Sequence, residues 1–135
     1  MIETVDAASR AHAVAAFLNS IGIETTLVDK TQAGFLGRVE IHEGSIRYTP
    51  VAFAGDLLHE AGHLAVTPSR YRHLMSGDVS EGVRKMCEAV MALNLEPGEP
   101  LLRAVLEASE PEATAWSWAA GAHLELKPQE IHRSE

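Results

Sequence analysis

The segment DLLHEAGHLAV, residues 56–66, predicts the helix around which the rest of this chain is organised. His59 and His63 are four residues apart, so both imidazoles lie on one face of a helix, about one turn apart. Both can therefore reach one metal ion, and Glu60 can reach a water molecule beside that ion. The alternative, a helix with these residues on its solvent face, fits less well, because leucines and alanines surround the histidines and two unpaired buried imidazoles would be costly. The pattern therefore favours a metal site over a structural histidine pair.

The composition is that of one globular domain, which we expect to span residues 1–135. Hydrophobic residues make up 46% of the chain, which is enough to form a buried core. The net charge of −8 argues against binding to nucleic acids or to an anionic membrane surface, but it leaves protein partners open. Cys87 is the only cysteine, so the ligands of any zinc ion must be histidines and carboxylates.

The N-terminal segment and the lengths of the hydrophobic runs indicate a cytoplasmic protein. Residues 1–18 lack the basic start and the long apolar stretch of a signal peptide. No apolar run approaches the roughly 18 residues that a membrane-spanning helix needs. We therefore expect a cytoplasmic location and no membrane partner.

The residues before the histidine segment predict one helix and a small sheet. Alanines and an apolar stripe predict the helix, with Asp6 as its cap. Alternating β-branched residues predict the first strand, and Glu43 with Gly44 suits a tight hairpin turn between the next two. The expected helix covers residues 5–20, and the expected strands cover residues 23–28, 36–41 and 45–49.

The residues that follow predict mostly helices, so the fold class is α+β. We expect a small, mostly antiparallel sheet of about three strands that packs against helices. Pro68 is expected to end the histidine helix. The expected helices cover residues 51–66, 81–95, 101–108 and 110–126, with an irregular stretch over 67–77 and a loose polar tail over 127–135.

A hydrolytic zinc site needs a third protein ligand and leaves the fourth position to water. Acidic residues on the helices after His63 are the candidates, among them Glu112 and Glu110. Glu112 also has a purely structural explanation, because Ser109 and Glu112 form an S-x-x-E capping box. Glu110 is the alternative ligand, since a helix boundary predicted from sequence can shift by about two residues.

The segment HEAGHL, followed about fifty residues later by a helix that reads E-x-x-A-x-x-x-A, resembles the ImmA/IrrE-type bacterial metallopeptidases. The resemblance covers roughly residues 14–126 and implies a zincin-like core of the gluzincin type. It implies that His59, His63 and Glu112 bind zinc and that Glu60 is the general base. Members of this family usually have Asn or Asp four residues after the third ligand. This chain has Trp116 at that position, and Trp cannot accept a hydrogen bond from a ligand imidazole.

These residues and the resemblance predict a zinc-dependent metallopeptidase with a peptide or protein as substrate. Glu60 is expected to accept the proton of the attacking water and to return it to the leaving amine. The strand over 45–49 is expected to hold an extended substrate, and His73, Arg70 or Arg72 to stabilise the oxyanion. Trp116 leaves open an inactive zinc-binding domain that acts as a regulatory or protein-interaction module with a protein partner. A structural domain without metal is the third alternative.

Overall fold

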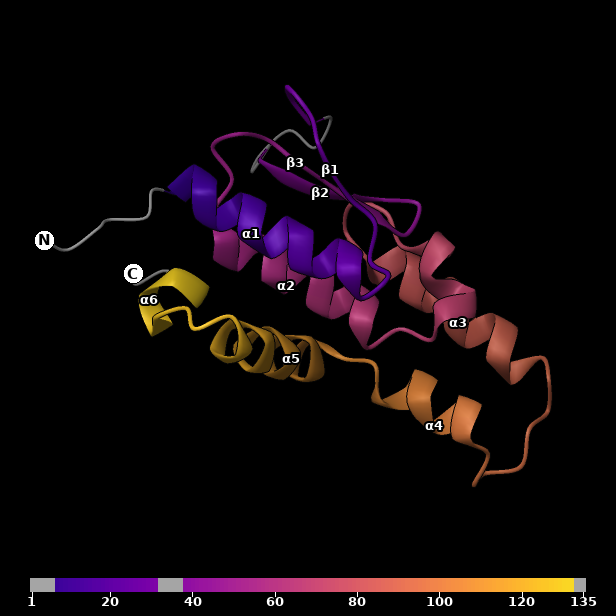
Figure 1. Ribbon diagram of the computed structural model, residues 1–135. Coiled ribbons are helices and arrows are strands. Elements are labelled where there is room, and N and C mark those ends of the chain that lie inside the picture. Colours follow the sequence, from indigo (N-terminus) through magenta and orange to yellow (C-terminus); the bar gives the residue numbers. More distant parts are fainter. Residues whose placement is uncertain (1–6, 32–37, 133–135) are drawn as a thin grey trace, which may run out of the picture.

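The helix that carries the two histidines, α2 (Ala54–Ala65), is the central helix of the fold. The structure is a computed structural model that describes residues 7–31 and 38–132. Helix α2 contacts the sheet, α1 (Ala7–Ser20) and, most extensively, α5 (Glu110–His123). Figure 1 shows α5 on the side of α2 that faces away from the sheet. The apolar residues of α2 therefore contact other elements on several sides of the helix. Four of them are fully buried: Leu57, Leu58, Ala61 and Leu64.

Among the described residues, three strands form the sheet, in the order β1 (Thr25–Leu27), β3 (Ser45–Tyr48), β2 (Val39–His42). The α+β class and the number of strands agree with the prediction. The sheet is mixed rather than mostly antiparallel, because β1 pairs with β3 in parallel and only β2 with β3 pairs antiparallel. The two-residue turn holds β2 and β3 side by side, which leaves one edge of each free, and β1 pairs with the edge of β3.

The turn between β2 and β3 has the backbone that its sequence predicts. Glu43 has a φ of 47° and Gly44 a φ of 84°, and two consecutive positive φ values are typical of a type I′ hairpin. Residues 75–77 close over this hairpin. The Gly44 amide donates to the carbonyl of Met75, and the Gly77 amide donates to the carbonyl of Ile41.

The middle of the chain is helical, including part of the stretch that was expected to be irregular. A 3₁₀ helix, η1 (Ser69–Leu74), follows Pro68, and α3 (Ser80–Met91) and α4 (Pro100–Glu107) come next. Helix α3 ends at Met91, short of the predicted end at 95. Among residues 7–31 and 38–132, no helix is long and apolar enough to cross a membrane.

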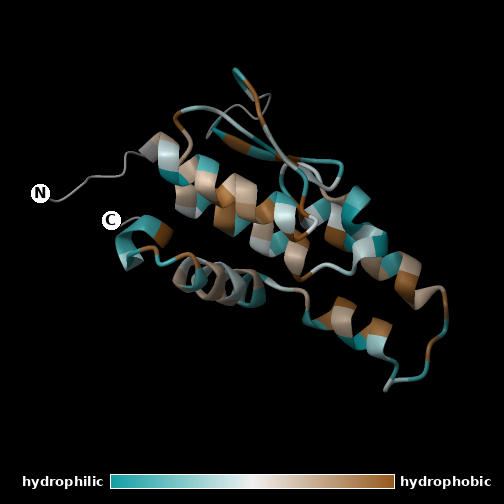
Figure 2. Ribbon diagram, in the orientation of Figure 1, coloured by the Kyte–Doolittle hydropathy of each residue, from teal (hydrophilic) through white to brown (hydrophobic). Residues whose placement is uncertain are grey.

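The C-terminal residues correct the expectation of a loose tail over 127–135. A short helix, α6 (Pro128–Ile131), docks beside α5 and α2, and Ile131 is buried. Glycines leave room for it, because the Ile131 side chain lies against Gly121 and its carbonyl lies against Gly55. Figure 2 shows mostly hydrophilic residues along α6. The buried Ile131, an ion pair between Glu130 and Arg10, and a Trp118–His132 ring stack hold this segment in place. Residues 133–135, the predicted cap Asp6 and residues 36–37 of the second predicted strand lie outside the described residues.

Candidate metal centre

The two histidines lie together on one face of α2, as their spacing predicts. Their ring centroids are 4.9 Å apart and the rings are nearly perpendicular. The His63 side chain is 12% exposed and the His59 side chain is 34% exposed. One ligand atom from each of His59, Glu60 and His63 can be chosen so that all lie within 4.8 Å of one another. This spacing is short enough for a single metal ion.

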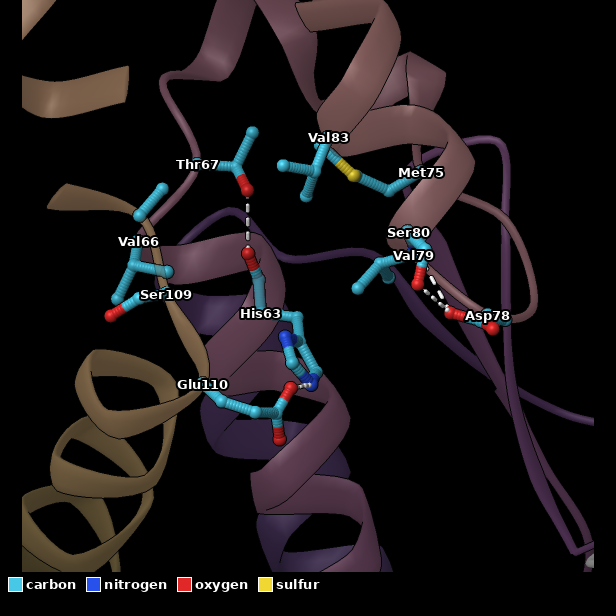
Figure 3. A pocket seen from close by; sticks show the side chains of 11 residues that line it. His63, Val66, Thr67, Met75, Asp78, Val79, Ser80, Val83, Ser109 and Glu110 are labelled. Carbon is cyan, nitrogen blue, oxygen red and sulfur yellow. Dashed lines mark hydrogen bonds and ion pairs between the residues drawn. The ribbon is translucent and has the colours of Figure 1, made fainter. Parts of the chain in front are cut away.

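A single carboxylate from α5 reaches both imidazoles. Oε1 of Glu110 lies 3.3 Å from Nε2 of His59, and Oε2 lies 3.0 Å from Nε2 of His63. Figure 3 shows the Glu110 side chain pointing at His63 from the start of α5. Helices α2 and α5, which are far apart in the sequence, thus bring two imidazoles and one carboxylate together.

Gly62 explains why α5 can come this close. A Cβ atom at Gly62 would lie 2.4 Å from the carbonyl oxygen of Ala113, which is well inside van der Waals contact. Any side chain at this position would push the backbone of α5 away from α2. The sequence showed only that a glycine here is costly for a helix; the structure gives the compensating contact.

We expect Gly62→Ala to destabilise the protein by about 1–2 kcal/mol. Alanine gains about 1 kcal/mol of helix propensity, but the clash is with backbone, and overpacking of this kind costs typically 1–3 kcal/mol or more. The measurement is urea unfolding of metal-free protein. Gly98→Ala is the matched control, because a Cβ there meets nothing within 4 Å. Equal stability of the two variants would contradict the packing role of Gly62.

Glu112, the ligand that the family resemblance implies, does not share this contact. It is the third residue of α5, it is exposed, and its amide donates to the Oγ of Ser109, which caps the helix. Residues two apart on an α-helix point about 200° apart, so Glu110 and Glu112 face opposite ways. Among the described residues, the ion pairs of both histidines go to Glu110. The S-x-x-E capping box was the sequence signal that assigned Glu112 to the helix end instead.

Burial and charge change the protonation of the site. Burial, and then the negative charges of Glu110 and Asp56, raise the pKa of Glu60 to about 7. Burial lowers the pKa of His63, which keeps this imidazole neutral near pH 7 and available as a ligand. Glu60 can therefore both accept and release a proton near neutral pH.

The basic residues expected to stabilise an oxyanion are used elsewhere. Nε of Arg72 donates to the carbonyls of Leu64 and Thr67, where it completes the end of α2. The Arg70 guanidinium lies 5.4 Å from the ring centroid of Tyr71. His73 is exposed on η1 and does not line either hollow beside the histidines. The structure thus gives no support to an oxyanion role for these three residues.

Two hollows flank the histidine pair. A cavity of about 360 Å³ borders His63 and Glu110, and one of about 100 Å³ borders His59, Glu60 and Val39. The strand beside the second hollow is β2. The expected substrate strand, β3, is hydrogen-bonded on both sides, to β1 and to β2, and so cannot add another strand.

Comparisons with known proteins give no match to this chain, whether with protein-family models, curated proteins or solved structures. The geometry of the site itself therefore carries the functional argument.

Proposed function

We propose that this protein is a zinc-dependent peptidase in which His59, His63 and Glu110 bind the ion and Glu60 is the general base. The observation that carries the proposal is the carboxylate of Glu110 in reach of both imidazoles. Ligand atoms at the usual zinc distances of about 2.0–2.2 Å, in tetrahedral geometry, are about 3.3 Å apart. Oε1 of Glu110 lies 3.3 Å from Nε2 of His59 and Oε2 lies 3.0 Å from Nε2 of His63, so each oxygen is near this spacing from one imidazole.

The chemistry of the donors also suits zinc. Imidazole nitrogen and carboxylate oxygen are ordinary zinc ligands, and three protein ligands leave a fourth position for water or substrate. The 62% exposure of the Glu110 side chain agrees with a site that is open on this side. When bound, zinc lowers the pKa of a water molecule to near 7 and polarises a substrate carbonyl.

Glu60 has the position and the proton affinity of the base. It follows His59 directly, and burial raises the pKa of its carboxyl in the metal-free chain, which favours uptake of one proton from the attacking water. The water oxygen bonds to the peptide carbonyl carbon, and the bond from that carbon to nitrogen breaks. Glu60 then gives its proton to the leaving nitrogen, so the products are a carboxylic acid and an amine. Burial is the largest cause of the raised pKa of Glu60, and the negative charge of Asp56, one turn earlier, adds to it.

The edge of β2 is our proposed place for the substrate backbone, in place of β3. β2 is an edge strand, and Val39 lies with His59 and Glu60 around the smaller hollow. Towards its far end the carbonyl of Ile41 already accepts a hydrogen bond from Gly77. An extended peptide would therefore pair with the start of β2, above α2, as in a zincin-like core.

With Glu110 as the third ligand, one reason for an inactive scaffold no longer applies. That reason was Trp116, four residues after Glu112. Four residues after Glu110 comes Thr114, whose hydroxyl can accept or donate a hydrogen bond. Trp116 is partly buried and packs against the hydrophobic core.

Zinc binding tests the proposal. Protein purified without a metal-affinity tag is expected to contain about one zinc ion per chain. Chelator-treated protein is expected to gain about 2.7 kcal/mol of stability at a zinc concentration 100 times the Kd, which raises its melting temperature by several degrees. Magnesium at the same concentration should have no such effect, because it prefers all-oxygen sites. Absence of zinc together with an unchanged melting temperature would contradict the proposal.

A further inference from the structure

The larger cavity beside the candidate metal centre combines apolar walls with two acidic side chains on opposite sides. It opens against His63 and Glu110 and has a volume of about 360 Å³, within the range of ligand pockets. The end of α2, the loop after η1, α3 and the residue before the α5 cap all contribute to it. Its apolar lining consists of Val66, Met75, Val79, Val83 and Ala108.

Asp78 stands at the side of this cavity opposite Glu110. Figure 3 shows His63 between the two acids, with Asp78 and Ser80 on one side and Glu110 with Ser109 on the other. Oδ1 of Asp78 accepts from the amide of Ser80 at 3.0 Å and from its hydroxyl at 2.6 Å. These bonds lower the pKa of Asp78, so it is charged at neutral pH. Both hydrogen bonds from Ser80 are accepted by Oδ1, so they do not involve Oδ2 of Asp78.

The charges of the lining residues have one sign. Lysine and arginine do not occur among the described residues that line this cavity, and its acids are Asp78 and Glu110. If Glu110 binds zinc, its charge is compensated there, and Asp78 remains as the uncompensated charge of the cavity. The chain as a whole carries a net charge of −8, which also attracts cationic peptides.

From this arrangement we infer that the cavity is the specificity pocket for a substrate side chain next to the cleaved bond, and that it selects lysine or arginine through Asp78. The inference rests on the proposed function. A lysine or arginine side chain has an aliphatic stem that matches the apolar walls and a cationic head that matches the acidic side chains. A leucine or methionine side chain would pack against the same apolar walls but would place an apolar end beside the charged carboxylate of Asp78.

A pair of inhibitors that differ in one charge tests this inference. We suggest succinyl hydroxamates with either a 4-aminobutyl or an n-pentyl side chain, which have nearly equal length, bound to zinc-loaded protein in a calorimeter. The wild type is expected to bind the aminobutyl compound about fivefold more tightly, as for an exposed ion pair. Asp78→Asn should abolish this preference, because asparagine keeps the acceptor for Ser80 but removes the charge. Glu81→Gln is the matched control, since Glu81 is paired with Arg84 and does not line the cavity.

The outcomes separate this inference from the proposed function. A preference that Asp78→Asn removes and Glu81→Gln retains supports the inference. Equal binding of the two compounds by the wild type, an unchanged preference in Asp78→Asn, or no binding of either compound to zinc-loaded protein overturns it while the zinc site stands. A protein that does not bind zinc at all refutes the proposed function and the inference with it. Melting temperatures of the variants within about 2 °C of wild type would show that the fold is intact.

Discussion

Glu60→Gln is expected to abolish peptide hydrolysis while zinc stays bound. Glutamine has the shape of the glutamate but cannot accept the proton of the attacking water at neutral pH. The loss in kcat should be roughly 10²–10⁴-fold, the usual contribution of a general acid–base group. The measurement is the release of fluorescent fragments from labelled casein by zinc-loaded protein, with the zinc content determined on the same sample.

The controls for this variant distinguish the base from a ligand. Glu112→Gln makes the same chemical change at an exposed position on α5 and should leave hydrolysis unchanged. Loss of zinc from Glu60→Gln would contradict the assigned role, because Glu60 also lies close enough to the histidines to act as a ligand. A wild type that holds zinc but cleaves no peptide would instead favour the regulatory zinc-binding module.

Glu110→Gln is expected to weaken zinc binding by at least about 100-fold. The neutral amide is a poor zinc ligand, and the variant would leave only the two histidines in place. Competition with a chromophoric chelator gives the affinity. The metal-free fold should change little in stability, because the Glu110 side chain is 62% exposed and its ion pairs with the histidines are partly in solvent.

Glu112→Gln is again the matched control, and the expected result is unchanged zinc affinity. The two glutamates are two residues apart on one helix and differ in which side of it they face. If Glu112→Gln were the variant that loses zinc, the ligand set implied by the family resemblance would be right, and the orientation of α5 described above would be wrong.

Features that depend on neighbouring residues could be predicted from the sequence. The spacing of His59 and His63 places both on one helix face whatever surrounds the helix. Glu43 and Gly44 both have positive φ values, which few other residue pairs adopt easily. These two residues therefore predict the β2–β3 hairpin. The apolar stripe predicted for the first helix is confirmed in part, since Val14 and Leu18 are buried but Ile21, also in that stripe, is 46% exposed.

Features that depend on distant segments could not be predicted in this way. The docking of α6 requires the space that Gly55 and Gly121 leave for Ile131, and these residues belong to three separate helices. The parallel pairing of β1 with β3 depends on how the chain returns after β1, which no short pattern specifies. The roles of Arg70 and Arg72 likewise follow from Tyr71 and from the end of α2.

The same distinction between neighbouring and distant residues applies to the candidate metal centre. The helical repeat is enough to place two imidazoles and Glu60 on one helix, because it sets their separation. Which glutamate of α5 faces them depends instead on how α5 packs against α2. The rotation of α5 depends on its backbone contact with Gly62, at a point about fifty residues away in the chain. That contact turns Glu110 toward the histidines and Glu112 away from them, because residues two apart on a helix face opposite sides.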